Sequence, residues 1–172
     1  MMRYADLPTA WGALRLVEKD GALVQVDFQS GRRPLVAAAQ WQWDPQALAP
    51  YLAEFAAYFA GQLRQFSLPC APQGTPFQQR IWQRLRQIGY GEVISYGELA
   101  SELGQPGASR AIGGAVGRNP LSVIIPCHRV VGHDGRLTGY AGGLDLKVAL
   151  LTLEGCHVAA GGRVRAAASG GR

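Results

Sequence analysis

The 172-residue sequence contains no apolar run near the ~20 residues that a membrane-spanning helix needs, which excludes the integral-membrane class. Its first residues, Met-Met-Arg-Tyr-Ala-Asp, lack the apolar core of a signal peptide, so we do not expect secretion. There are only three cysteines, Cys70, Cys127 and Cys156; they cannot all pair and show no CxxC spacing. We therefore expect a cytoplasmic protein whose thiols stay reduced.

Charge is also scarce, at 17% of residues against 48% apolar residues, which is a globular composition. The net charge of +5 is uneven: residues 1–74 hold six basic and six acidic residues, and residues 75–172 hold eleven and six. Fifteen of the seventeen basic residues are arginine, which indicates a polyanionic partner such as nucleic acid. The alternative is a GC-rich genome that favours arginine, with three of the charges, on Arg163, Arg165 and Arg172, in a Gly/Ala-rich tail.

Residues 1–70 predict a small α/β domain that opens with strands. Alternating apolar residues occupy 12–17 and 22–28, and Asp20-Gly21 between them is a typical turn sequence. The pattern predicts a β-hairpin.

A helix is expected to follow over residues 46–60, where apolar residues recur at helical spacing after a possible N-cap at Asp44. Pro50 either kinks this helix or marks its true start. Residues 68–74, with two prolines and a glycine, predict a linker.

A second domain is expected over residues 75–156. Thr75-Pro76-Phe77-Gln78 is a capping box with proline at the first helical position, so a helix should begin here and end near Gly89. Two short helices, at 95–103 and 108–117, are separated by a glycine-containing turn. They form a candidate helix-turn-helix.

The rest of this half predicts β-rich segments at 122–125 and 129–131, followed by a last helix over 145–153. Residues 157–172 are rich in Gly, Ala and Arg and have too few apolar residues to pack. We expect them to be a disordered tail.

Cys127 and His128 are the first candidate catalytic pair, since an imidazole can take the proton of a thiol and a carboxylate can orient the imidazole. Neighbouring residues of a strand point to opposite faces, so this pair needs a bend or a bridging water to cooperate. The alternative is that Cys127 is an ordinary buried cysteine of the core.

Five ordered motifs surround this pair: FQQRIW at 77–82, GYGEVISYG at 89–97, NP at 119–120, IIPCHRVVG at 124–132 and GYAGGL at 139–144. Over residues 75–155 they resemble the O6-alkylguanine-DNA alkyltransferase family, the methylated-DNA–protein-cysteine S-methyltransferases. The first half, ending in YFAG at 58–61, resembles the more variable first domain of that family.

The resemblance implies an α/β (α+β) fold, with a small ribonuclease-H-like N-terminal domain and a winged-helix-like C-terminal domain. It also implies DNA repair by one irreversible transfer of an alkyl group from guanine O6 to a cysteine, with O4-methylthymine left open as a second substrate. Cys127 matches the acceptor, His128 would take its proton through a water, Glu154 would orient His128, and Asn119 would link the second helix to the active-site strand. Without the resemblance, Glu154 is a solvated charge at a helix end and Asn119 a helix C-cap.

DNA binding is implied in the same way. Arg110 would fill the stack that a flipped base leaves, in a helix that enters the minor groove. Tight packing against the core is the alternative reason for the glycines of this helix. Lys147 would bond near the site or merely extend its stem along the helix to solvent. The residues assigned to DNA or substrate contacts are Tyr96, Arg110, Ala111, Gly113, Gly114, Val130, Tyr140, Ala141 and Lys147.

Two positions depart from the family pattern: Ala141 replaces a common serine, and no aromatic residue follows Lys147. No cofactor is implied, and the zinc site of some relatives has no ligands here. The expected partner is double-stranded DNA bearing O6-alkylguanine, bound by a monomer, with cooperative assembly left open. The rival interpretations are a non-enzymatic lesion binder, a winged-helix regulator and a cysteine hydrolase.

Overall fold

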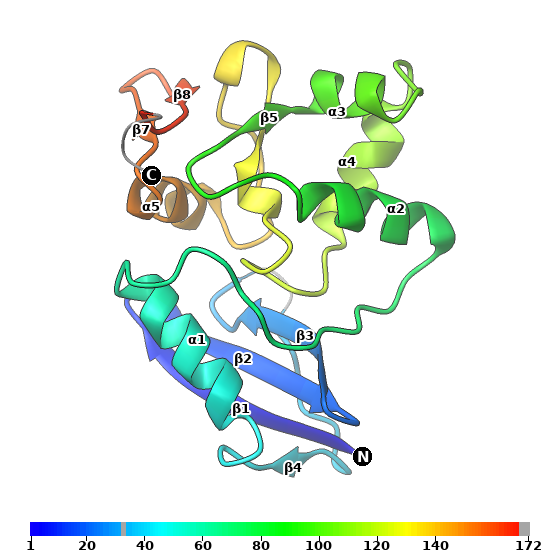
Figure 1. Ribbon diagram of the computed structural model, residues 1–172, viewed down its shortest axis with the longest axis vertical. Coiled ribbons are helices and arrows are strands. Elements are labelled where there is room, and N and C mark those ends of the chain that lie inside the picture. Colours follow the sequence, from blue (N-terminus) through cyan, green and yellow to red (C-terminus); the bar gives the residue numbers. More distant parts are fainter. Residues whose placement is uncertain (32–33, 169–172) are drawn as a thin grey trace. The chain divides into compact units, whose positions relative to one another are not determined.

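The computed structural model describes residues 1–31 and 34–168 (Figure 1). The chain forms two compact units. The first consists of residues 1–73 and 120–124, and the second of residues 74–119 and the chain from Ile125 onward. No helix in the described ranges is long and apolar enough to cross a membrane.

A four-stranded sheet of order β3-β2-β1-β4 forms the first unit. β1 (Met2–Thr9), β2 (Gly12–Lys19) and β3 (Ala22–Phe28) are antiparallel neighbours, and β4 (Gln42–Trp43) runs parallel to β1. The predicted hairpin is confirmed as β2–β3. Its two turn residues, Asp20 and Gly21, both have positive φ, as a tight hairpin turn of this length favours.

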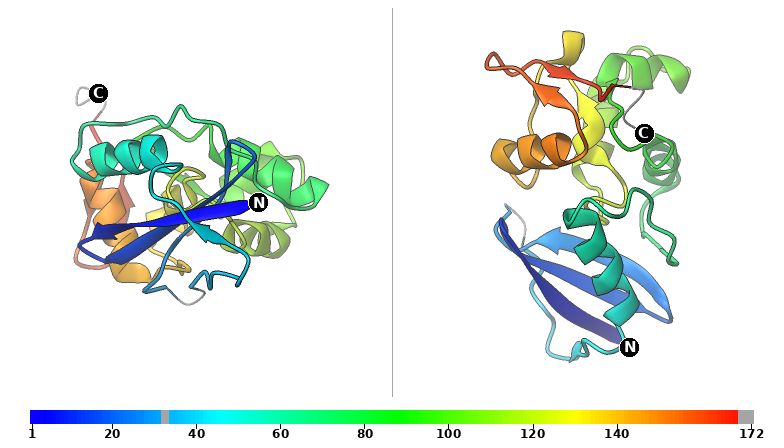
Figure 2. Two further views of the ribbon diagram at one scale, coloured as in Figure 1. Left: turned by 90° about the horizontal axis from the view of Figure 1, so that it is seen from below. Right: turned by 60° about the vertical axis from the view of Figure 1, so that its left-hand side comes forward.

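One face of this sheet is covered by α1 (Ala49–Phe59), as both views in Figures 1 and 2 show. The helix buries Tyr51, Phe55 and Tyr58. Pro50 lies in its first turn, so the alternative that proline marks the true start is correct. The expected N-cap is wrong, because the cap is Leu48; Asp44 instead accepts a hydrogen bond from the Ala47 amide.

The second unit begins with α2 (Pro76–Leu85), and its predicted capping box is confirmed. The Thr75 side chain accepts from the Gln78 amide at 3.1 Å, and the Gln78 side chain accepts from the Thr75 amide at 2.9 Å. The helix ends four residues before Gly89.

α3 (Tyr96–Glu102) and α4 (Ser109–Gly117) are the two short helices expected from the sequence. The Ser95 side chain caps α3 by accepting from the Glu98 amide at 3.0 Å. α4 packs against α2, where the Trp82 indole donates to the Ala115 carbonyl at 2.9 Å. The helix pair is thus anchored through one buried aromatic residue.

The β-rich segment expected at 122–125 is not a strand of the second domain. Residues 120–124 belong to the first unit, where the Val26 amide donates to the Pro120 carbonyl and the Ser122 amide to the Val26 carbonyl. Val123 then has a φ of 74°, which ends any extended run. The domain predicted over 75–156 is therefore interrupted, because this short segment satisfies backbone groups of β3.

The remaining elements of the second unit surround a short parallel pair, β5 (Ile94–Ser95) and β6 (Val130–Val131). α5 (Leu144–Leu153) is the predicted last helix, and η2 (His133–Gly135) is the turn before it.

The disordered tail is a wrong prediction for residues 157–168. β7 (His157–Val158) and β8 (Val164–Arg165) pair as a hairpin, and Val164 packs into a small core with Val131, Leu151 and Cys156. The valines of the hairpin, Val158 and Val164, supply the apolar contact that the low overall hydrophobicity concealed. The last four residues of the expected tail, 169–172, lie outside the described residues.

Candidate active site

Cys127 and His128 lie in a 3-10 turn, η1 (Cys127–Arg129), that immediately precedes β6. The Cys127 amide donates to the Ile125 carbonyl at 2.7 Å, which bends the chain around Pro126. Successive residues of a 3-10 turn are separated by about 120° rather than by the alternation of a strand. The two side chains therefore do not point to opposite faces as they would in a strand, and a bridging water between them stays a prediction.

Asn119, directly after α4 and its C-cap Arg118, contacts the Cys127 thiol. Its side-chain amide lies 2.6 Å from the Ile125 carbonyl and 3.1 Å from the Cys127 sulfur. An amide N–H directed at sulfur stabilises the thiolate more than the thiol. The structure therefore brings Asn119 to the cysteine, in addition to its position at the end of a helix.

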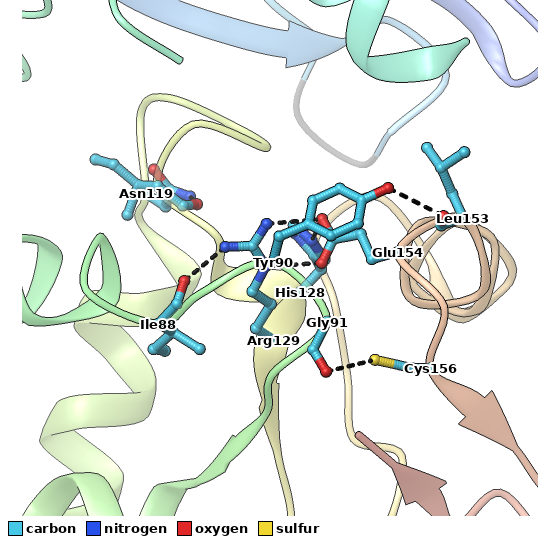
Figure 3. Close-up of polar contacts among 10 residues, drawn as sticks. Ile88, Tyr90, Gly91, Asn119, His128, Arg129, Leu153, Glu154 and Cys156 are labelled. Atoms are coloured by element: carbon cyan, nitrogen blue, oxygen red, sulfur yellow. Dashed lines mark hydrogen bonds and ion pairs between the residues drawn. The ribbon is translucent and has the colours of Figure 1, made fainter. Parts of the chain in front are cut away.

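His128 is completely buried, and its Nε2 lies 2.8 Å from Glu154 Oε2 (Figure 3). Glu154 is the C-cap of α5, and its carboxylate is also fully buried. The alternative interpretation of Glu154, a solvated charge at a helix end, is therefore wrong. Among the described residues, Nδ1 of His128 is buried without a hydrogen-bond partner.

Arg129 completes this buried cluster, and the sequence did not assign it a role. Its Nε and one terminal nitrogen contact the two oxygens of Glu154 at 2.7 and 2.9 Å, and its other terminal nitrogen donates to the Ile88 carbonyl at 2.6 Å. The guanidinium carbon also lies 5.9 Å from the centre of the Tyr90 ring. Figure 3 shows Arg129 between Ile88 and Glu154. The sequence signal that could have identified Arg129 is its position directly after Cys127 and His128 in the motif at 124–132.

The protonation states of this cluster follow from burial and charge. Burial lowers the pKa of His128, and Glu154 offsets this effect only in part. Burial alone would raise the pKa of Glu154, but His128 and Arg129 outweigh it and hold that pKa well below its usual range. A neutral His128 contributes a hydrogen bond rather than a charge, so the Arg129 cation is the charge that keeps Glu154 ionised. With Nε2–H donating to Glu154, Nδ1 is the basic nitrogen.

Lys147 of α5 is fully buried, so its stem does not extend to solvent. Its ammonium group donates to the Val130 carbonyl at 2.7 Å and contacts the Thr138 carbonyl and hydroxyl at 3.3 and 3.2 Å. Burial lowers the pKa of Lys147 to about 8, against an opposing effect of Cys127. One lone pair of the Val130 carbonyl is thus already used, and the second remains for another donor.

Tyr96 is the first residue of α3, and it lies near Cys127 and Thr138. Burial raises the pKa of Tyr96, and the nearby Thr138 side chain opposes this effect only in part. At neutral pH the Tyr96 hydroxyl is therefore protonated.

The loop before α5 carries Tyr140, Ala141 and Gly142. Tyr140 is half-buried and Ala141 is exposed. A Cβ on Gly142 would lie 2.6 Å from the Leu146 side chain and 2.9 Å from the Tyr140 ring. Any larger residue at position 142 would therefore require the Leu146 or Tyr140 side chain to move.

Arg110 and Ala111 are exposed in the first turn of α4. The glycines of this helix are not required by its packing in the protein. A Cβ on Gly113 would meet its nearest atom, on Tyr96, at 3.9 Å, and one on Gly114 would meet only the end of Arg118 at 3.4 Å. Core packing, the alternative explanation, therefore does not account for them.

The two other thiols, Cys156 and Cys70, lie in surroundings different from those of Cys127. Cys156 is buried and donates to the Gly91 carbonyl at 3.5 Å, and burial raises the pKa of its thiol. Cys70 is half-buried, in the first unit. Within the described ranges, no group of three or more His, Cys, Asp and Glu side chains is placed to hold a metal.

Comparisons with known proteins agree with this geometry. The profile described as "6-O-methylguanine DNA methyltransferase, DNA binding domain" matches residues 76–156, and that of the "ribonuclease-like domain" matches residues 2–72. A methylated-DNA–protein-cysteine methyltransferase of Mycobacterium tuberculosis is 52% identical over 155 residues, covering 90% of this chain and 93% of the relative. One from Methanosarcina acetivorans is 43% identical over 154 residues, covering 90% and 99%.

Solved structures agree as well. The crystal structure of Mycobacterium tuberculosis OGT in complex with DNA matches with a TM-score of 0.83 and 42% identity, covering 88% of this chain and 92% of that one. The ribonuclease-like first domain and the DNA-binding second domain expected from the sequence are thereby confirmed. The chain belongs to the 6-O-methylguanine DNA methyltransferase family.

Proposed function

We propose that this protein repairs alkylated DNA by moving the alkyl group from O6 of guanine to the sulfur of Cys127, once per molecule. The observation that carries the proposal is the buried chain from Arg129 through Glu154 to a neutral His128, next to a thiol contacted by Asn119. A reducing, cytoplasmic compartment suits this chemistry, because only the free thiol can act as acceptor.

The proton of the Cys127 thiol passes to Nδ1 of His128 through a bridging water. This nitrogen is the basic one, since Nε2–H is committed to Glu154. The ionised Glu154 stabilises the imidazolium as it forms. The three side chains thus supply a thiolate at neutral pH without a permanently charged histidine.

The thiolate attacks the alkyl carbon, so that a C–S bond forms as the C–O6 bond breaks. The electron pair of the broken bond goes to guanine, which ends as the ordinary base after taking up one proton. The Ala141 amide donates to O6, and the Cys127 carbonyl and the remaining lone pair of Val130 accept from the guanine amino group. The Tyr96 hydroxyl lies beside the base, Tyr140 and the 142–143 turn form its wall, and Lys147 holds the loop through Thr138.

The target base must leave the duplex to reach a buried thiol. α4 approaches the minor groove, and its unforced glycines Gly113 and Gly114, with Ala111, give the short side chains that close contact needs. The exposed Arg110 occupies the space that the flipped nucleotide leaves in the stack. Minor-groove contacts read little sequence, which suits a repair protein.

Replacing Arg110 with alanine is expected to slow transfer from duplex DNA by about tenfold or more, because the unstacked state costs a few kcal/mol without a side chain in the gap. Transfer from the free O6-methylguanine base should change less than twofold, since no stack is opened. Single-turnover rates on both substrates measure this difference. Equal losses on the two substrates would remove Arg110 from base flipping.

The rival functions fit the site less well. A regulator would read bases through side chains on α4, and two central glycines offer none. A lesion binder has no use for an acceptor thiol with a buried base beside it. A cysteine hydrolase would release its product and turn over.

The test is a titration with excess methylated duplex in which transferred methyl groups are counted. One methyl group per protein, with no further release, is expected. Continued turnover would indicate a hydrolase, and transfer of none would refute the proposal.

A further inference from the structure

The C-terminal hairpin of the second unit has one apolar and one basic face. β7 and β8 lie next to the loop over η2, to which they are joined by the hydrogen bond from the Leu137 amide to the Gly162 carbonyl at 2.7 Å and by an antiparallel bridge between Arg136 and Arg163. Val158, Val164 and Leu137 face the core with Cys156. The hairpin is therefore a fixed part of this unit.

The strand register gathers the basic residues on the outer face. Arg163 and Arg165 are two residues apart, so they point to the same side, opposite to the buried Val164. Arg136 lies directly across from Arg163, and His157 directly across from Arg165. All four are exposed. We call Arg136, His157, Arg163 and Arg165 the hairpin basic face.

The loop that carries Arg136 packs closely against the hairpin. A Cβ on Gly135, whose φ is +78°, would lie 2.6 Å from the Val164 carbonyl oxygen. The backbone next to Arg136 thus passes directly over the strand that carries Arg163 and Arg165. The backbone positions of the three arginines are therefore held close to one another by the contacts between the loop and the hairpin.

No ion pair neutralises these arginines within the described ranges. The nearest acidic residue along the loop, Asp134, lies 3.2 Å from Nε2 of His133. Two arginines directly opposite each other on neighbouring strands destabilise the pairing. A cluster of like charge on an ordered surface, with no internal partner, fits an anionic ligand.

We propose that the hairpin basic face binds the phosphate backbone of DNA, as a contact surface separate from α4. Guanidinium groups suit phosphates because they present paired N–H donors in a plane. The face offers three of them side by side, since Arg136 lies across from Arg163 and Arg165 is two residues further along the chain. Contacts to phosphates carry no sequence information. The contribution of this face is therefore affinity without sequence preference.

Figures 1 and 2 show the hairpin and α4 on different sides of the second unit, with β5 and β6 between them. The face would therefore hold phosphates away from the flipped base, either in the flanks of the same duplex or in a second duplex segment. The inference rests on the DNA-binding assignment of this unit, but it does not depend on the chemistry at Cys127.

The test is the triple variant R136Q/R163Q/R165Q, compared with the wild type for binding to an undamaged duplex across a salt series. The slope of log K against log salt is negative, and each lost phosphate contact reduces its magnitude by about 0.9, so a slope less steep by about 2 to 3 is expected. Its transfer rate from the free O6-methylguanine base should equal that of the wild type. If the wild type bound no DNA, the DNA-binding assignment itself would fail.

A control removes the same net charge elsewhere, in R3Q/K19Q/R86Q, whose three residues are exposed; Arg3 has long ion pairs, of 3.8 and 3.9 Å, with Glu18 and Asp44. If only long-range charge mattered, the triple variant and the control would show the same reduction in the magnitude of the salt slope. If the true partner were an acidic protein, the slope of the triple variant for DNA would equal that of the wild type. Either result would overturn the proposal. A loss seen only with a duplex of about three turns places the contact in the flanks. A loss also seen with about one turn, at two duplexes per protein, places it on a second segment.

Discussion

Replacing His128 with glutamine is expected to lower the rate of methyl transfer by about 10²- to 10⁴-fold at pH 7, the range that a positioned general base contributes. The variant keeps the thiol and its Asn119 contact but has no basic nitrogen where Nδ1 lies. The rate is measured in a single turnover with a duplex containing O6-methylguanine. The end point should still be one methyl group per protein, reached slowly.

The control for this variant is His133→Gln, since the His133 side chain is 92% exposed and lies in the same unit. It should transfer at the wild-type rate. A loss of less than about threefold in the His128 variant would show that the thiol loses its proton by another route.

The pH profile of the wild type should be unusual for a histidine base. Because burial lowers the pKa of His128, the imidazole stays neutral as the pH falls through the ordinary value of about 6.5. The transfer rate should therefore persist below that pH and decline only further into the acid range. This acid limb provides a readout for the next variant.

Replacing Arg129 with methionine is expected to lower the free energy of unfolding by about 3–5 kcal/mol, because the buried Glu154 loses its cationic partner. Denaturant unfolding at pH 7 measures the loss. Arg84→Met is the matched control, since Arg84 pairs with Glu102 at the surface at 2.6 Å and should cost less than about 1 kcal/mol. Equal losses in the two variants would contradict a special role for the buried pair.

The same substitution should raise the pKa of His128, because a nearby positive charge is removed and Glu154 is left to attract a proton. The acid limb of the rate profile should then move to higher pH. Arg129→Lys, which keeps the charge and loses the paired contacts, should retain the limb and lose only part of the stability. An unmoved limb in a folded methionine variant would make Arg129 a purely structural residue.

The depressed pKa of Glu154 also fixes the direction of the stability change with pH. The contribution of this carboxylate is present above its unfolded pKa of about 4.3 and is lost as the pH falls below it. His128 acts in the same direction, since the unfolded chain binds its proton at higher pH than the folded one. The methionine variant should therefore show a weaker acid dependence.

Local signals in the sequence predicted much of the fold. The Thr75–Gln78 capping box and the Asp20-Gly21 turn each depend on residues within four positions of one another, so they can be found without tertiary information. Pro50 left two alternatives, and only the structure chose between them.

The parts that the sequence could not predict depend on distant contacts. Glu154 meets His128 and Arg129 across 26 and 25 positions, and nothing local distinguishes it from a solvated charge at a helix end. The segment 120–124 leaves its expected strand because β3 offers it backbone partners. The hairpin at 157–165 forms because Val164 finds a core that its own neighbours in sequence do not supply.

The most direct measurement of the central claim is the intact mass of the protein, followed by peptide mapping, after incubation with a duplex containing O6-methylguanine under reducing conditions. One added methyl group, a gain of about 14 Da, is expected on the peptide that contains Cys127. Cys127→Ser should show no gain, and Cys156→Ser should be modified like the wild type. No adduct on the wild type, or an adduct that remains in the Cys127 variant, would contradict the account.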